Sequence, residues 1–233
     1  MSASQNTLPT AAKTLVIFQA TGIGDLLWLT PYLHRIAAGS RDGKVSLLAN
    51  PTTRARDLFA ADATVAEVID FTGRRRRDDP KQLHNTLRGL LRLAGELKQR
   101  RFDRVFVFGG RANLAFLTFA AGIKQRHGYG FHWVQRLFLN RRPFIKNRRG
   151  VSYENATAFA IALGLCDAPQ IPKLSIPASL VEKMRARFAA ARRPLYALGI
   201  GASAPEKQWA PANFRLLTER LLQRNCGILL AGG

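Results

Sequence analysis

Asp25 is the residue of this sequence best placed to do chemistry. It follows a tight turn that contains Gly22 and Gly24, and the turn follows the apolar run Leu15-Val16-Ile17-Phe18. Such a run predicts a buried parallel strand, and the apolar-rich segment 26–36 predicts a helix. The carboxylate therefore stands where the carboxyl end of a strand meets the amino end of a helix. Open α/β sheets bind their ligands at such junctions.

Two roles for Asp25 are open from its position alone. A carboxylate in the first turn of a helix is stabilised by the free backbone amides and by the helix dipole, which is a structural role. The same dipole keeps the carboxylate ionised, as a general base must be. A classical dinucleotide site is disfavoured, because Leu27 stands where the third glycine of G-x-G-x-x-G would be.

The composition indicates a basic protein with enough apolar residues for a substantial core. The 233 residues are 47% hydrophobic and carry a formal net charge of +21, which predicts attraction to nucleic acid, an anionic membrane surface or phosphorylated substrates. Two cysteines are too few for a disulfide framework or a zinc site. Without a signal pattern or an apolar run long enough to cross a bilayer, the expected location is cytoplasmic.

Alternating strand and helix patterns predict an α/β protein with parallel sheets. Residues 1–12 are expected to be a disordered leader, 13–168 a first domain, 169–177 a proline-rich linker and 178–233 a second domain. The second domain shows only two strand patterns, which is too few to bury a parallel sheet. We therefore expect this domain to be incomplete, and the chain by itself to show no measurable activity.

Two segments together resemble the bacterial lipopolysaccharide heptosyltransferases, glycosyltransferase family 9. The first is Gly22-Ile23-Gly24-Asp25 with Thr30-Pro31, and the second is the stretch GIGASAPEKQWAP at 199–211, followed by Phe214. Between them, Phe102-Asp103-Arg104-Val105 and Phe138-Leu139-Asn140-Arg141-Arg142 stand in the order that the family uses. The resemblance covers nearly the whole chain after the leader.

The resemblance implies a GT-B fold of two Rossmann-like domains, the C-terminal one truncated here. It implies an inverting, metal-independent transfer, without a cofactor, from a nucleotide sugar to the lipopolysaccharide core. In this family the nucleotide sugar is commonly ADP-heptose. Asp25 would be the general base that deprotonates the acceptor hydroxyl. Gly22 and Gly24 would let the acceptor approach closely. Ser203 and Lys207 would bind the diphosphate of the donor.

Basic residues cluster in the N-terminal half of the sequence. They suit an acceptor rich in carboxylates and phosphates, and also the anionic cytoplasmic face of the inner membrane, where the protein would be peripheral. Arg111 follows Gly109-Gly110 at a predicted strand end and is the best candidate for acceptor contact. The run Arg74-Arg75-Arg76-Arg77 is expected to be an exposed loop. His127 and His132 are expected to be ordinary surface or loop residues, and no metal site is predicted.

Two functions other than sugar transfer are alternative interpretations of this sequence. Aromatic residues alternate with arginines between Tyr129 and Phe144, as in surfaces on which nucleic-acid bases stack. No helix-turn-helix, zinc-finger or RNA-recognition signature accompanies them, so specific nucleic-acid binding is not expected. A non-catalytic, membrane-associated homologue is the other alternative. A test of Asp25→Asn would separate it from an enzyme.

Overall fold

The computed structural model describes residues 11–72, 84, 86–145, 150–202 and 207–232. It divides into two compact units, Met1–Ser175 and Ile176–Gly233, and each is described by itself. The division falls within the segment predicted to be a linker. Residues 1–10 of the predicted leader, the arginine run 74–77 and Ser203 lie outside the described residues. Ala11 and Ala12, the last residues of the predicted leader, accept hydrogen bonds from Arg41.

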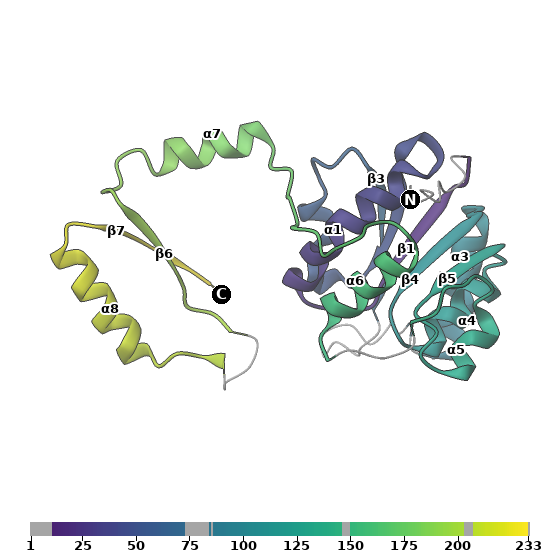
Figure 1. Cartoon of the computed structure of the whole chain (residues 1–233). Coiled ribbons are helices and arrows are strands. Elements are labelled where there is room, and N and C mark those ends of the chain that lie inside the picture. Colours follow the sequence, from purple (N-terminus) through teal and green to yellow (C-terminus); the bar gives the residue numbers. More distant parts are fainter. Residues whose placement is uncertain (1–10, 73–83, 85, 146–149, 203–206, 233) are drawn as a thin grey trace. The chain divides into compact units, whose positions relative to one another are not determined.

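The first unit is built on a parallel sheet of five strands in the order β3-β2-β1-β4-β5 (Figure 1). The strands are β1 (Thr14–Phe18), β2 (Val45–Ala49), β3 (Val65–Asp70), β4 (Arg104–Phe108) and β5 (Gln125–Gly128). The central strands β1, β2 and β4 are buried along their whole length. Burial on both faces explains why their sequences, TLVIF, VSLLA and RVFVF, are mostly apolar. The sheet confirms the predicted α/β class.

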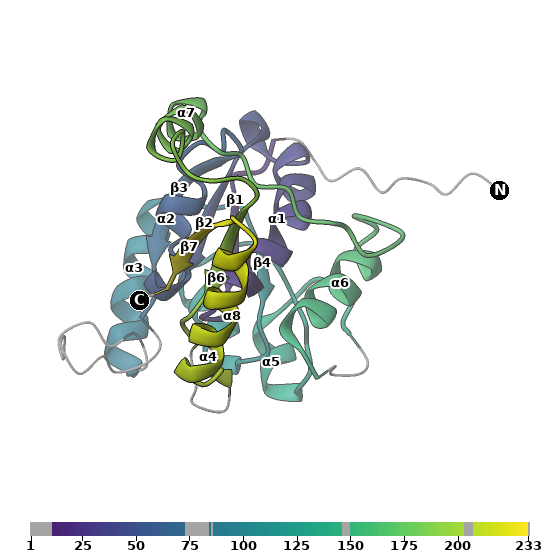
Figure 2. The same ribbon diagram turned by 90° about the vertical axis from the view of Figure 1, so that its left-hand side faces the viewer.

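Helices cover both faces of this sheet (Figure 2). Side chains of α1 (Ile23–Ala38) and α6 (Ser152–Ala162) pack on one face, and those of α3 (Leu87–Gln99) and α4 (Ala112–Ala120) pack on the other. The remaining helices are α2 (Ala55–Leu58), α5 (Trp133–Phe138) and the 3₁₀ turns η1 (Arg41–Gly43) and η2 (Pro51–Thr53). The chain is thus wound in both directions from β1, and the strand order reverses between β1 and β4. This reversal is the ligand-binding switch point of such sheets.

The sequence of residues 124–149 has little periodicity. Its described part nevertheless contains an edge strand and a short helix. Strand β5 has the sequence QRHG, which lacks the apolar run that marks a strand. Helix α5 has only six residues, fewer than two turns, so it shows no clear period. The expectation that His127 is a surface or loop residue is wrong. His127 lies in β5, is 8% exposed, and stacks on Phe106 with the ring centroids 4.6 Å apart.

His127 is expected to make the stability of the fold depend on pH. Burial, together with Arg104 and Arg141, lowers the pKa of His127 from 6.5 to about 4. The unfolded chain therefore binds a proton more tightly than the folded chain. The contribution of neutral His127 is fully present above pH 6.5 and is lost as the pH falls toward 4. The free energy of unfolding falls by about 3 kcal/mol when this contribution is fully lost.

A His127→Phe variant keeps a ring against Phe106 and removes the titrating group. Urea unfolding at pH 7.5 and pH 4.5 should show a smaller loss of stability for this variant than for the wild type. An equal loss in both proteins would show that His127 is not the group responsible.

Arg104 is the largest fully buried side chain of the unit. From the first residue of β4, its guanidinium donates hydrogen bonds to Thr14 Oγ1, Ser40 Oγ and the carbonyl of Gly39. Gly39 is the C-cap of α1, where a cation also interacts favourably with the helix dipole. Arg104 therefore ties β1, β4 and the end of α1 together. Burial lowers the pKa of this guanidinium, and neighbouring Asp103 opposes the shift.

The second unit contains a parallel pair, β6 (Leu195–Gly199) and β7 (Gly227–Ala231), with α7 (Ala178–Arg187) and α8 (Pro211–Gln223). The sequence predicts a helix from Pro211 to Gln223, and α8 has these bounds. Pro211 stands at its first position, where the missing N–H costs nothing. Neither α7 nor α8 contains a buried residue. Within the described part of the chain, no helix is both long enough and apolar enough to cross a membrane.

Candidate functional site

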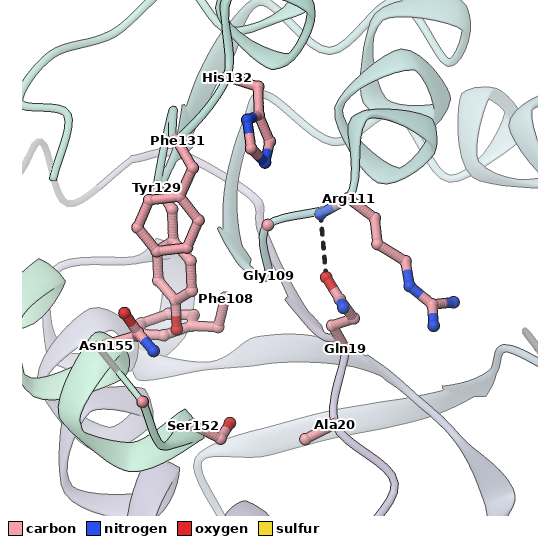
Figure 3. Close-up of a pocket in the computed structure, with 12 residues that line it drawn as sticks. Gln19, Ala20, Phe108, Gly109, Arg111, Tyr129, Phe131, His132, Ser152 and Asn155 are labelled. Atoms are coloured by element: carbon pink, nitrogen blue, oxygen red, sulfur yellow. Dashed lines mark hydrogen bonds between the residues drawn. The ribbon is translucent and has the colours of Figure 1, made fainter. Parts of the chain in front are cut away.

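A cavity of about 550 Å³ lies where the strand order reverses. Its wall comes from the loop after β1, the loop after β4, the residues that follow β5 and the start of α6. Figure 3 shows Tyr129 and Asn155 on one side of the open space and Gln19 and Arg111 on the other, with the Arg111 guanidinium pointing away from Tyr129. The lining residues are Gln19, Ala20, Phe108, Gly109, Gly110, Arg111, Tyr129, Phe131, His132, Gly150, Ser152 and Asn155.

Gly109 and Gly110 allow two cavity-lining side chains to approach the backbone. A Cβ atom on Gly109 would lie 2.5 Å from Gln19 Oε1, and one on Gly110 would lie 2.8 Å from a ring carbon of Phe131. Gln19 joins the ends of β1 and β4. Its backbone N–H donates to the carbonyl of Phe108 at 3.1 Å, and its Oε1 accepts from the N–H of Arg111 at 3.0 Å. The glycine pair is thus required for the shape of the cavity.

Gln135 does not line the cavity but forms hydrogen bonds to two residues that do. This fully buried residue of α5 donates from Nε2 to the carbonyl of Gly109 at 2.7 Å, and its Oε1 accepts from the N–H of Phe131 at 3.1 Å. Two loops that line the cavity are therefore connected through one side-chain amide.

Gln135→Leu is expected to destabilise the first unit by about 2–3 kcal/mol, because it leaves a buried carbonyl and a partly buried N–H without partners. Leucine has a similar size, so the lost hydrogen bonds dominate the effect. Urea unfolding measures it, with Gln99→Leu at the exposed end of α3 as the matched control. Equal stability of the two variants would contradict the role of Gln135.

The electrostatics of the cavity favour an anion. Arg111 and His132 line it, and none of its lining residues is an Asp or a Glu. Helix α4 begins directly after Arg111, and α6 begins at Ser152, so the positive ends of two helix dipoles lie at this wall. Burial raises the pKa of Tyr129, so its hydroxyl stays protonated and can donate a hydrogen bond. The site suits a ligand that carries carboxylate or phosphate groups.

Asp25 stands in the first turn of α1, two residues after its first helical residue, and is half-buried. Its carboxylate lies back over the N-cap residue, since a Cβ on Gly22 would be 2.9 Å from Asp25 Oδ2. No hydrogen bond or ion pair links this carboxylate to any other described residue. A capping hydrogen bond therefore does not account for Asp25, although the dipole still favours its charge. A Cβ on Gly24 would meet no atom within 4 Å, so this side of the turn is open.

Two contacts show how α1 and α6 run relative to each other. Trp28 stacks on Tyr153 at 5.1 Å, and one turn further Tyr32 Oη lies 2.6 Å from Thr157 Oγ1. The two helices are therefore parallel, and their N-termini lie at the same end of the unit. Asp25 begins one of these helices, and the cavity residue Ser152 begins the other. This arrangement brings Asp25 to the end of the unit where the cavity opens.

The structure distributes the predicted site residues over three places. Gly22, Gly24 and Asp25 form the start of α1, and Arg111 lines the cavity as the N-cap of α4. Lys207 is an exposed residue of the second unit. The described residues contain no group of three or more His, Cys, Asp or Glu side chains that could hold a metal ion.

Sequence reasoning missed most of the cavity. Gln19 directly follows β1, a signal that could have identified it, because ligands bind at strand ends. His132 is an exposed loop residue, as predicted, and it also lines the cavity, which the sequence did not indicate. Tyr129, Gln135 and Asn155 gave no signal, because their burial depends on segments distant in sequence.

Comparison with solved structures identifies the fold first. The fold matches ADP-heptose lipopolysaccharide heptosyltransferase II of E. coli with a TM-score of 0.70 and 20% identity over 94% of this chain. It matches a family 9 glycosyltransferase of Veillonella parvula with a TM-score of 0.73 and 16% identity over 99% of this chain. These likenesses confirm the predicted GT-B fold. The chain spans 63% and 65% of the lengths of those two proteins.

A family model then identifies the family itself. The model of glycosyltransferase family 9 (heptosyltransferase) matches residues 90–233, and the chain belongs to this family. A third solved structure, E. coli heptosyltransferase WaaC with ADP-2-deoxy-2-fluoro heptose, is 20% identical, with a TM-score of 0.63 over 95% of this chain and 69% of that one. No curated protein sequence matches significantly.

Proposed function

We propose that this chain takes part in an inverting transfer of heptose from ADP-heptose to the lipopolysaccharide core. The observation that carries the proposal is the cavity beside the start of α1, which is lined by Arg111 and His132 and by no carboxylate. The inner core of lipopolysaccharide is rich in carboxylates and phosphates, and Arg111 can bind such groups through two parallel hydrogen bonds. Residues 13–168 would bind the acceptor, and residues 178–233 would contribute to donor binding.

Asp25 is the general base of the proposed reaction. Its carboxylate takes the proton of the acceptor hydroxyl while the hydroxyl oxygen attacks the anomeric carbon of the donor sugar. The bond between that carbon and the diphosphate oxygen breaks, and ADP leaves with the electron pair. Attack from the face opposite the leaving group inverts the anomeric configuration. Gly22 gives the carboxylate room, and the open side of Gly24 gives room to the acceptor.

The diphosphate of the donor is assigned to Lys207 and Ser203 in the second unit. Lys207 is exposed, so its ammonium group is accessible to a phosphate. A lysine that binds phosphate must be accessible in this way. E. coli WaaC, a structural relative, has been solved with ADP. The proposed transfer uses no metal and no other cofactor, as the resemblance to the family implies. The proposed location is the cytoplasmic face of the inner membrane, where a lipid-anchored acceptor would be available.

The test is a transfer assay with a protein that contains these 233 residues. ADP-heptose and a lipopolysaccharide core lacking its heptose are incubated with the protein, and mass spectrometry follows the acceptor. Supporting results are a gain of one heptose per acceptor, release of one ADP, and an inverted anomeric centre by NMR. Binding of both substrates without transfer, in a protein that contains a complete donor domain, would favour the non-catalytic homologue.

A further inference from the structure

The segment from residue 104 to residue 153 contains ten Lys or Arg residues and no Asp or Glu. It forms β4, α4, β5 and α5, which make one edge of the sheet and the helices beside it. Charge of a single sign over such a length produces a strong local field toward anions. Only Arg104 of the described members is fully buried, and the others have half-exposed or exposed side chains.

Large apolar side chains project from the same elements. Trp133 is 72% exposed and Leu137 is 64% exposed, and they stand one helical turn apart on α5. Phe119, at the end of α4, is 52% exposed. Helices α4 and α5 pack against each other (Figure 1). Exposure of three large apolar residues on two packed helices has no explanation within the first unit.

Contacts among α4, β5 and the segment after α5 place these charged and apolar residues on one continuous surface. Phe119 packs against Phe138 of α5 at 5.6 Å, and the guanidinium of Arg126 lies over the Phe119 ring at 5.4 Å. Asn140 donates from Nδ2 to the carbonyl of Lys124 at 2.9 Å, which brings the segment after α5 against the start of β5. We call this the α4–α5 surface. It consists of Phe119, Lys124, Trp133, Arg136, Leu137 and Arg141.

We propose that the α4–α5 surface docks the protein on an anionic lipid bilayer. Trp133, Leu137 and Phe119 enter the interface between head groups and acyl chains, and the basic residues contact the lipid phosphates. The surface adjoins the cavity, because α4 begins after Arg111 and α5 begins after His132, which both line it. The proposal rests on the proposed function in one respect, since a lipid-anchored acceptor would then reach the cavity from the membrane.

The composition of the surface favours a bilayer over a nucleic acid. Bases stack on exposed aromatic faces, but Tyr129, the first aromatic of the alternating segment, is only 5% exposed. Leu137 offers no aromatic face to a base, yet it is among the most exposed residues of the surface. Aliphatic and Trp side chains surrounded by arginines are typical of segments that lie in the membrane interface.

The test is co-sedimentation with vesicles that contain no sugar. Binding to vesicles of phosphatidylglycerol and phosphatidylcholine is compared with binding to phosphatidylcholine alone. We expect Trp133→Ala and Leu137→Ala each to weaken binding to the anionic vesicles about tenfold. The control Ile161→Ala, an exposed apolar residue of α6 on the other face of the sheet, should have little effect. Arg141→Gln should weaken binding about fivefold, and its control Arg35→Gln on α1 should not.

Several results would overturn the proposal. They are no binding to anionic vesicles, equal binding to both kinds of vesicle, or equal effects of Leu137→Ala and Ile161→Ala. Tighter binding to a plain DNA duplex than to vesicles, unchanged in the Leu137→Ala variant, would assign the surface to nucleic acid instead. Because the vesicles carry no acceptor, failure here leaves transfer to a water-soluble acceptor unaffected. Loss of that transfer would in turn leave vesicle binding unchanged.

Discussion

Replacing Asp25 with asparagine is expected to lower sugar transfer by about 10²- to 10⁴-fold. The amide has the shape of the carboxylate but cannot take a proton from the acceptor hydroxyl. No described residue bonds to the Asp25 side chain, so its replacement removes no structural contact. The rate of ADP release in the presence of acceptor measures the effect, in a protein that contains this chain.

The stability and the substrate affinities of the Asp25→Asn protein serve as controls. The substrate affinities should match the wild type, because the lining of the cavity does not change. The free energy of unfolding should fall by no more than about 1 kcal/mol, through the lost interaction of the charge with the helix dipole. Gly22→Ala is a useful companion, since its Cβ would lie 2.9 Å from Asp25 Oδ2 and would displace an otherwise intact carboxylate. A fall in transfer in this variant would connect the rate to the position of the carboxylate. Unchanged transfer by Asp25→Asn would remove Asp25 from the catalytic role.

Arg104→Ala is expected to destabilise the first unit by about 3–5 kcal/mol. The substitution leaves a large cavity between β1, β4 and the end of α1. It also removes the donors that satisfy the carbonyl of Gly39 and the hydroxyls of Thr14 and Ser40. Such a loss is a large part of the total stability of a domain of this size. Equilibrium unfolding in urea gives the change directly.

Arg104→Met separates the two causes of this loss. Methionine fills most of the space but donates no hydrogen bond, so its cost should be smaller, about 1–3 kcal/mol. Arg88→Ala, at an exposed position of α3, should change stability by no more than about 0.5 kcal/mol. If Arg104→Ala resembles this control, the buried guanidinium does not hold the unit together.

The sequence predicts the elements whose signals are local. Strands β1 and β4 each contain a run of four apolar residues, because both faces of a central parallel strand are buried. Helix α8 begins at Pro211 and has the predicted bounds, since proline marks the first turn of a helix. The leucine spacing of residues 81–101 predicts a helix, and among the described residues of this range α3 spans Leu87–Gln99. The Thr86 hydroxyl accepts a hydrogen bond from the N–H of Gly89 and caps this helix.

Prediction from the sequence fails where a residue is buried by segments that are distant along the chain. Strand β5 reads Gln-Arg-His-Gly, yet it pairs with β4, and His127 becomes a core residue through its contact with Phe106. The buried site of Arg104 is invisible in sequence, because its partners Thr14, Gly39 and Ser40 lie far from it along the chain. An arginine is ordinarily exposed, and only the arrangement of β1, β4 and α1 supplies enough acceptors to bury it.

The sequence by itself determined the α/β class, the family and the position of Asp25 after the first strand. These depend on short apolar runs, turn glycines and motif residues that are neighbours along the chain. Only the tertiary structure decided which residues share a site. The cavity joins Gln19, Arg111, Tyr129 and Asn155 because parallel strands end at one edge of the sheet and the chain winds in both directions from β1. Proximity of that kind is a property of strand order, which no local pattern encodes.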